Sequence, residues 1–254
     1  MQEIVQSVDR ALSIIEVLSD FENGLGITEI SEKVELSKST VYRLLSTLIY
    51  KGYVKQNQSD SMYSLTLKLF ELGNKKVENM NLTTVALPYL EELMKKTNEV
   101  VHLVVRDGIE MVYISKVEPK KTIRMYSRIG KRIPMYCTAV GKAMMSQMTE
   151  KEIETIWEKS NIKKLTDKTI ININDIKKDL KEIREKGYAI DEQENELGIR
   201  CIGTVIRGYN GKLWGAISVS GSILSFTTDK IKDFANYILE CSNIISKELG
   251  YRPL

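Results

Sequence analysis

The sequence is poor in the residue types on which metal and thiol chemistry depends. Its 254 residues include one histidine, His102, and three cysteines, Cys137, Cys201 and Cys241, which lie far apart and form no C-x-x-C pair. An odd number of isolated cysteines argues against a disulfide framework or a thiolate zinc site and favours reduced thiols in a cytoplasm. We expect no metal ion and no cofactor in this protein.

Long hydrophobic runs are also lacking. No segment approaches the roughly 20 apolar residues that are needed to cross a bilayer. The first ten residues, MQEIVQSVDR, contain acids in place of the apolar core of an export signal. We therefore expect a cytoplasmic protein that does not enter a membrane, and a chain of this length favours two domains.

Charge of one sign is scarce overall but concentrated in one segment. The formal net charge of +3 does not by itself suggest a polyanionic partner. Between positions 37 and 59, however, every charged side chain is basic: Lys38, Arg43, Lys51 and Lys55. A local positive field is what an element that enters a nucleic-acid groove needs, although the charges alone fit a solvated helix face equally well.

The apolar pattern around this segment predicts three short helices. Residues 7–21 and 28–34 carry apolar side chains at helical spacing, and a tight turn at Glu35 and Leu36 follows them. Ser37 is placed to cap the third helix, whose inward stripe is Val41, Leu44, Leu45 and Leu48. Two helices joined by a tight turn are typical of a helix-turn-helix motif.

The outward face of the third helix is polar. In a helix-turn-helix protein the first turns of this helix reach base edges and phosphates in the major groove. We therefore predict that DNA is recognised by Lys38, Ser39, Thr40, Tyr42 and Arg43. The next segment, GYVKQNQSDSMYSL, reads as two strands around a polar turn. This wing would offer to the DNA backbone or minor groove Lys55, Gln56 and Gln58, so that residues 1–65 form a winged helix-turn-helix domain.

The rest of the chain is predicted to hold a linker and a second domain. Residues 66–80 form a linker helix, and its leucines suggest that it packs against a partner subunit, with packing inside its own chain as the alternative. Residues 81–254 alternate between strand and helix patterns, with hairpin turns at 106–108 and 210–211 and a strand expected over 122–130. The fold class is therefore α+β.

Several segments resemble the IclR family of bacterial transcriptional regulators over nearly the whole chain. They are SVDRALSIIEVL, LSKSTVYRLLSTL, VHLVVRDG, YSRIGKRIPMYCTAVGKAM, REKGYAIDEQENELGIRCIGTVI and GAISVSGS. One of them alone would be weak, but their order and spacing together are specific. The resemblance implies an N-terminal winged helix-turn-helix and a C-terminal GAF-like effector-binding domain, assembled as a homodimer through the N-terminal region or a homotetramer through the effector domains.

The resemblance also implies an effector site. The segment CTAVGKA resembles the loop whose backbone amides hold a ligand carboxylate, which places Ala139 and Val140 at the ligand. Family members often have a smaller residue where Val140 stands, which puts the close approach of a ligand there in doubt. The segment YAIDEQENELGIRC matches the part of the family that supplies Asp191 and Cys201 to the ligand.

The segment AISVSG matches the family's strand that supplies Ser218 and Ser220 to the ligand. Residues i and i+2 of a strand share one face, and the residues alone leave open whether this face meets a ligand or solvent. An ionised Asp191 would repel an anionic ligand, so we expect this carboxyl group to face a ligand hydroxyl or to share a proton.

The function implied by the resemblance is that of a transcriptional regulator that binds operator DNA, with repression as the expected action. Its effector would be a small carboxylate metabolite, a keto acid or a sugar acid such as 2-keto-3-deoxygluconate. One alternative is a ligand-independent DNA-binding protein whose second domain serves only in assembly. Another is a thiol-dependent enzyme that pairs Cys201 with His102, but a single histidine without an anchoring acid makes a weak case. We predict no catalytic residues.

Overall fold

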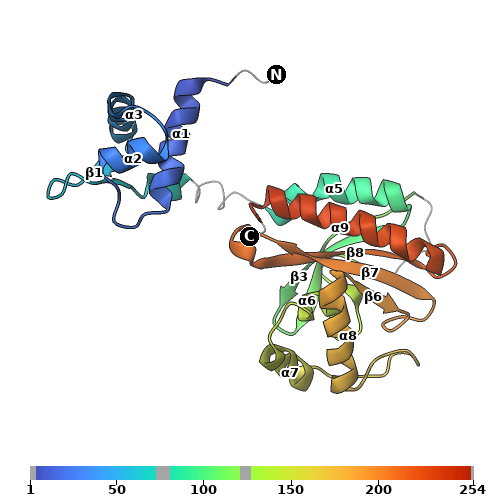
Figure 1. Ribbon diagram of the computed structural model, residues 1–254. Coiled ribbons are helices and arrows are strands. Elements are labelled where there is room, and N and C mark those ends of the chain that lie inside the picture. Colours follow the sequence, from blue (N-terminus) through green and yellow to red (C-terminus); the bar gives the residue numbers. More distant parts are fainter. Residues whose placement is uncertain (1–3, 73–80, 121–126, 253–254) are drawn as a thin grey trace. The chain divides into compact units, whose positions relative to one another are not determined.

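The first part of the chain folds into three helices and a short hairpin (Figure 1). The structure is a computed structural model that describes residues 4–72, 81–120 and 127–252. It divides into two compact units, Met1–Asn79 and Met80–Leu254. The elements of the first unit are α1 (Gln6–Ser19), α2 (Ile27–Lys33), α3 (Lys38–Tyr50), β1 (Val54–Gln56) and β2 (Tyr63–Leu65), followed by a helical turn at 68–72.

The predicted cap and stop signals define α3. Ser37 Oγ accepts a hydrogen bond from the Thr40 amide at 3.4 Å. The helix ends before Gly52, whose φ of 80° lies in the left-handed region that favours glycine. The inward stripe of α3 is buried except for the half-buried Leu44. Its residues Val41, Leu45 and Leu48 pack against apolar side chains of α1 and α2, namely Ile14, Leu18 and Ile30.

A six-stranded sheet forms the centre of the second unit. All neighbouring strands are antiparallel, and their order is β5-β4-β3-β8-β7-β6. The strands are β3 (Val100–Asp107), β4 (Glu110–Val117), β5 (Arg132–Pro134), β6 (Ala189–Glu192), β7 (Ile199–Arg207) and β8 (Leu213–Ser222). In the hairpin between β7 and β8, Asn210 and Gly211 both have positive φ, 61° and 74°, as the predicted tight turn requires.

Helices cover both faces of this sheet (Figure 1). One face is covered by α5 (Leu82–Thr97) and α9 (Ile231–Glu248), and the other by α6 (Ala139–Met145), α7 (Glu150–Lys159) and α8 (Ile173–Lys186). Short 3₁₀ turns at Tyr209–Gly211 and Thr228–Lys230 lie in the connections. Among the described residues no helix is both long and apolar enough to span a bilayer.

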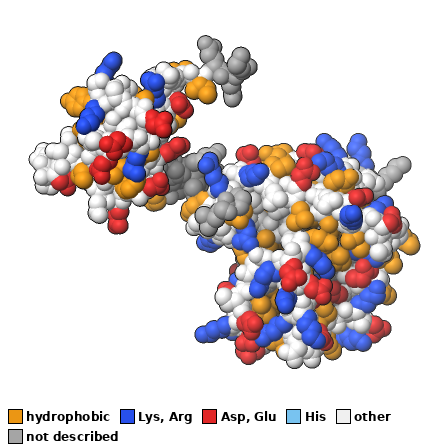
Figure 2. Space-filling model, viewed as in Figure 1, with side chains coloured by type: hydrophobic (Ala, Val, Ile, Leu, Met, Phe, Trp, Pro, Cys, Tyr) orange, Lys and Arg blue, Asp and Glu red, His pale blue; other side chains and the backbone are white. Residues whose placement is uncertain are grey.

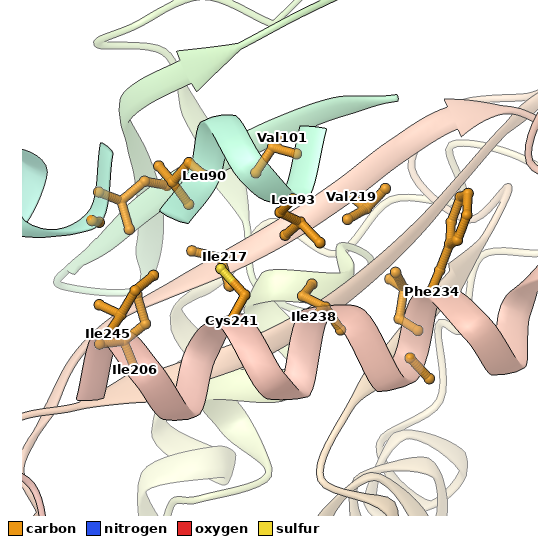
Figure 3. Packing of buried hydrophobic residues seen from close by; sticks show 14 of the residues in the cluster. Leu90, Leu93, Val101, Ile206, Ile217, Val219, Phe234, Ile238, Cys241 and Ile245 are labelled. Atoms are coloured by element: carbon orange, nitrogen blue, oxygen red, sulfur yellow. The ribbon is translucent and has the colours of Figure 1, made fainter. Parts of the chain in front are cut away.

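The face under α5 and α9 is a continuous apolar core. Figure 3 shows side chains of the two helices meeting those of the strands: Leu90, Leu93, Val101, Ile206, Ile217, Val219, Phe234, Ile238, Cys241 and Ile245. Full burial of a leucine or isoleucine side chain contributes about 1.5–3 kcal/mol. This face therefore supplies much of the stability of the second unit, and the buried Ser242 and Ser246 of α9 bond to the backbone of β7.

The opposite face combines an apolar cluster with buried polar groups. Its apolar part includes Val104, Met111, Met144, Met145, Ile176 and Leu180. Strands β3, β7 and β8 place polar side chains on this same face, because alternate residues of a strand point to the same side. Buried polar side chains are costly unless they are bonded, so the partners of these groups decide what this face can do.

One expectation differs from the structure, and another is only partly covered by the described residues. The strand expected over 122–130 is wrong where it can be examined: residues 127–130 are not in a strand, and the short β5 follows at Arg132 instead, while residues 121–126 lie outside the described residues. The predicted linker helix is helical at 68–72, and residues 73–80 lie outside the described part of the chain. The division into 1–65, 66–80 and 81–254 stays a prediction.

Candidate functional site

The polar face of α3 is exposed as the sequence predicts. Because Val41, Leu45 and Leu48 point into the core, the opposite side of the helix faces solvent. The side chains of Lys38, Ser39, Tyr42 and Arg43 are exposed, and that of Thr40 is half-buried. The Ser37 hydroxyl lies 3.1 Å from Ser39 Oγ and 2.9 Å from Thr40 Oγ1, so the first turn of α3 is fixed by a local network.

A cleft separates α3 from the start of α1. It has a volume of about 300 Å³ and is lined by Gln6, Ser7, Arg10, Thr40, Arg43, Leu44 and Thr47. Two arginines from different helices thus line one polar cleft beside the predicted recognition surface. Arg10 was not singled out from the sequence, although it is the one basic residue in α1.

The wing is a two-stranded hairpin with a polar tip. Residues Val54–Gln56 pair with Tyr63–Leu65, and the side chains of Lys55, Gln56 and Gln58 are exposed. The Gln56 amide donates to the Ser61 carbonyl oxygen at 3.2 Å, which makes this side chain part of the hairpin's own bonding. On the face shown in Figure 2, acidic and basic side chains are interspersed over both units.

In the second unit, α6 begins directly above the sheet. Thr138 caps this helix: its Oγ1 accepts from the Gly141 amide at 3.2 Å and donates to the Pro134 carbonyl oxygen at 2.7 Å. The first intrahelical bond runs from the Lys142 amide to the Thr138 carbonyl oxygen. The amides of Ala139 and Val140 precede this bond and have no acceptor within the helix. Both residues are buried.

Strand pairing brings the other predicted site residues together on the face that α6 covers. Asp191 on β6 pairs with Cys201 on β7, and Cys201 pairs with Ser220 on β8. Ser218, two residues away on β8, pairs with His102 on β3. The side chains of Asp191, Ser218 and Ser220 are buried and that of Cys201 is half-buried. The two serines therefore point into the domain and not to solvent.

His102 lies at the centre of this polar row. Its Nδ1 is 3.4 Å from both Ser218 Oγ and Ser220 Oγ, its Nε2 is 2.8 Å from Ser127 Oγ, and its ring packs on Tyr113 at 4.7 Å between centroids. Burial, together with the positive charge of Lys116, lowers the pKa of His102 to about 3. The imidazole is neutral at pH 7, so it acts as a hydrogen-bonding group without charge.

Asp191 is held in a tight turn. Its Oδ1 accepts from the Glu194 amide at 2.7 Å and from the Asn195 amide at 3.3 Å. Burial raises the pKa of this carboxyl group to about 7, although the two amide bonds oppose the shift. Asp191 is therefore a group that can gain or lose a proton near neutral pH.

The thiol–imidazole alternative has the wrong electrostatics. Burial and the charge of Asp191 hold the pKa of the Cys201 thiol well above its usual value, whereas a nucleophilic cysteine needs a lowered pKa. The low pKa of His102 makes it a poor base as well. Within the described residues no group of three or more histidine, cysteine or acidic side chains is arranged to hold a metal ion.

Sequence reasoning missed one buried charged group of this site. Lys142, in the second turn of α6, is 2% exposed, and its ammonium contacts Asp179 of α8 and Glu194. The signal in the sequence is a lysine within the otherwise small and apolar run AVGKAMM. A lysine in such a run indicates a buried, paired charge, because an unpaired one would be too costly.

Comparisons with known proteins agree with this arrangement in both units. Residues 7–58 match the family described as the IclR helix-turn-helix domain, and residues 74–247 match the family described as bacterial transcriptional regulator IclR C-terminal. The two matches fall on the unit that contains α3 and the unit that contains the buried polar row.

Individual relatives lead to the same family. The chain is 37% identical to the HTH-type transcriptional regulator KdgR of Escherichia coli, over 97% of this chain and 94% of that protein. It is 29% identical to the HTH-type transcriptional repressor AllR of Salmonella typhimurium, over 99% and 93%. The crystal structure of the Thermotoga maritima IclR matches with 35% identity and a TM-score of 0.65, covering 98% of this chain and all of that one (100%). These proteins are regulators and not enzymes, and the chain belongs to the IclR family of bacterial transcriptional regulators.

Proposed function

We propose that this regulator binds operator DNA through α3 and the wing and that a small carboxylate metabolite bound in the second unit controls its affinity for DNA. The observation that carries the proposal is the buried polar row of the second unit, because Ser218 and Ser220 both contact the side chain of His102, whereas the buried serines of α9 bond to the backbone. Buried polar groups of this kind are typical of a ligand site.

The chemistry of the row fits a carboxylate with further oxygen groups. The Ala139 and Val140 amides can donate to a carboxylate, and the serine hydroxyls can donate to or accept from a keto or hydroxyl group. The neutral His102 adds no charge. The effector class that we propose is a keto acid or a sugar acid, of which 2-keto-3-deoxygluconate is one example, and repression is proposed because AllR is named a repressor.

We also propose that the first unit forms a homodimer. An apolar groove of about 570 Å³ is lined by Val8, Ala11, Leu12, Ile15, Leu44, Leu48, Tyr53, Leu69 and Leu72, together with polar Ser7 and Thr47. Val8 and Leu12 are more than half exposed, at 56% and 53%. A second copy would cover these side chains and place two copies of α3 on one DNA duplex, as symmetric half-sites require. A tetramer through the second units would pair two such dimers.

The first prediction concerns DNA. Arg43→Ala should weaken binding to the preferred operator by about 1–3 kcal/mol, because a bidentate contact to a guanine is lost. Lys55→Ala should weaken binding to all sequences about equally and make the slope of log K against log salt shallower by roughly 0.9. The probe is a duplex that the protein selects from random DNA, measured at several salt concentrations. Lys159→Ala, which removes an exposed charge from α7, is the control; unchanged operator affinity in both test variants would refute the assignment.

The second prediction concerns assembly. Leu12→Glu should convert a dimer into a monomer, because it places a carboxylate in the apolar contact. Sedimentation equilibrium at micromolar concentration measures the change. Tyr50→Glu, at a side chain that is 85% exposed and outside the groove, should stay dimeric. A wild-type protein that sediments as a monomer both with and without operator DNA would contradict the proposal.

The third prediction concerns the two serines. Ser218→Ala and Ser220→Ala should each cost about 1–3 kcal/mol in effector affinity, because each leaves a polar atom of the ligand without a partner. Calorimetry against a panel of small keto acids and sugar acids is the test, with Ser225→Ala in the exposed loop after β8 as the control. DNA binding without effector should hardly change, since the serines and α3 belong to different compact units. Full affinity in both serine variants would place the effector elsewhere.

The fourth prediction concerns pH. The pKa of Asp191 is about 7 in the folded protein, and an anionic ligand beside it raises that pKa further, so the bound form holds more protons than the free form. Affinity should therefore fall as pH rises through about 7, at most about tenfold per pH unit. Calorimetry in buffers of different ionisation enthalpy should show proton uptake, and Asp191→Asn should abolish both effects. A pH-independent affinity in the wild type would exclude this role for Asp191.

A further inference from the structure

The buried ammonium of Lys142 joins three segments around the polar row. Its Nζ lies 2.8 Å from Asp179 Oδ2 on α8 and 2.5 Å from Glu194 Oε1 in the turn after β6. Burial by itself lowers the pKa of a lysine, but the two carboxylates outweigh it and hold the pKa of Lys142 above its usual value. The lysine is therefore charged, and both of its partners are needed to offset the cost of burying it.

The second carboxylate oxygen of Glu194, Oε2, differs from Oε1 in its hydrogen bonding. The Glu194 side chain is 7% exposed, and in the described part of the chain its Oε2 has no hydrogen-bond partner. A buried polar atom without a partner costs about 1–3 kcal/mol, and more where the group is charged. Such atoms are rare in native proteins, so this one requires a structural explanation. A carboxylate oxygen can only accept a hydrogen bond, so what is missing is a donor.

Glu194 lies beside the polar row. Its backbone amide donates to Asp191 Oδ1, so the two acids share one turn. Lys142, which holds its Oε1, is one turn of α6 beyond Ala139. Burial together with the charges of Asp191 and Glu194 raises the pKa of Cys137, directly before the cap of α6, to about 12. Glu194 is thus adjacent, through its backbone amide and its Oε1, to residues of the proposed effector site.

We propose that Glu194 determines effector specificity: Lys142 orients its carboxylate, and the unpartnered Oε2 accepts a hydrogen bond from a hydroxyl group of the effector. This inference rests on the proposed carboxylate effector of the same site. It selects a monocarboxylate that carries hydroxyl groups. An acid without hydroxyls leaves the oxygen unpaired, and a second carboxylate on the effector would face it with a charge of the same sign.

A purely structural role for Lys142, Asp179 and Glu194 predicts a different outcome for effector binding. If Glu194 and Asp179 only neutralise Lys142, they are equivalent, and removal of either acid should have the same consequence for binding. Glu194→Met and Asp179→Met form a matched pair, because each replaces one carboxylate partner of the same ammonium with the same apolar side chain and leaves the other partner in place.

The test compares matched six-carbon acids by calorimetry. The probes are gluconate with hexanoate, and 2-keto-3-deoxygluconate with 2-oxohexanoate, which differ within each pair in their hydroxyl groups. We expect the wild type to bind a hydroxylated member at least ~10-fold more tightly than its partner, as one unpaired buried acceptor implies. Asp179→Met should keep this preference and Glu194→Met should lose it. Specific DNA binding without effector checks that both variants are folded.

If Glu194→Met does not fold, Glu194→Gln serves in its place. Lys142 can only donate, so the amide oxygen faces it and the amide nitrogen takes the position of Oε2. A hydroxyl can also accept a hydrogen bond, but the bond to a neutral amide is weaker than one to a carboxylate, so the preference for the hydroxylated acids should shrink without vanishing. Equal affinity of the wild type for both members of each pair, or equal loss in the Glu194 and Asp179 variants, would overturn the role of Glu194 while the carboxylate effector stands. Failure of all four acids to bind would overturn both proposals.

Discussion

The close contact between α6 and the sheet is the constraint on which the proposed effector site depends. A Cβ atom at Gly203 of β7 would lie 2.9 Å from the Ala139 carbonyl carbon and the Val140 nitrogen, and one at Gly141 would lie 2.3 Å from the backbone of Met135. These distances are shorter than side-chain carbons tolerate, so the helix can rest there only because both positions are glycine. This close contact brings the first backbone amides of α6 and the Lys142 side chain to the polar row.

The two faces of the sheet in the second unit differ in polarity. The face under α5 and α9 is mainly apolar, and its buried serines on α9, Ser242 and Ser246, bond to the backbone of β7. The face under α6 carries His102, Asp191, Ser218 and Ser220, all buried, so it sacrifices some of the stability that an apolar core would give. This cost fits the proposed effector site, because a ligand can complete the hydrogen bonding of a polar interior that is nearly satisfied.

Local features of the fold were predictable from the sequence. The cap at Ser37, the apolar stripe of α3 and the turn at Asn210 depend on neighbouring residues only, and all three are present. Strand β5 was missed because its three residues, Arg132–Pro134, are too few to show alternation, and they are strand only through pairing with β4.

The candidate site was predictable where a segment carries its own signature and not where distant segments meet. The serines of β8 share a face by strand geometry alone. The partners of Lys142 could not be named, since Asp179 and Glu194 lie 37 and 52 positions along the chain. The resemblance to a family supplied the positions of Asp191 and Cys201, but the raised pKa of Asp191 comes from burial that only the folded structure reveals.

The position of His102 between two serines affects how the proposed site can bind an effector. One imidazole nitrogen lies 3.4 Å from both hydroxyls, yet a ring nitrogen has either one proton to give or one lone pair to share. The two hydroxyls therefore compete for this nitrogen, and Ser220 also contacts the Cys201 thiol. In the proposed site, an effector that bonds one serine therefore leaves the imidazole its bond to the other.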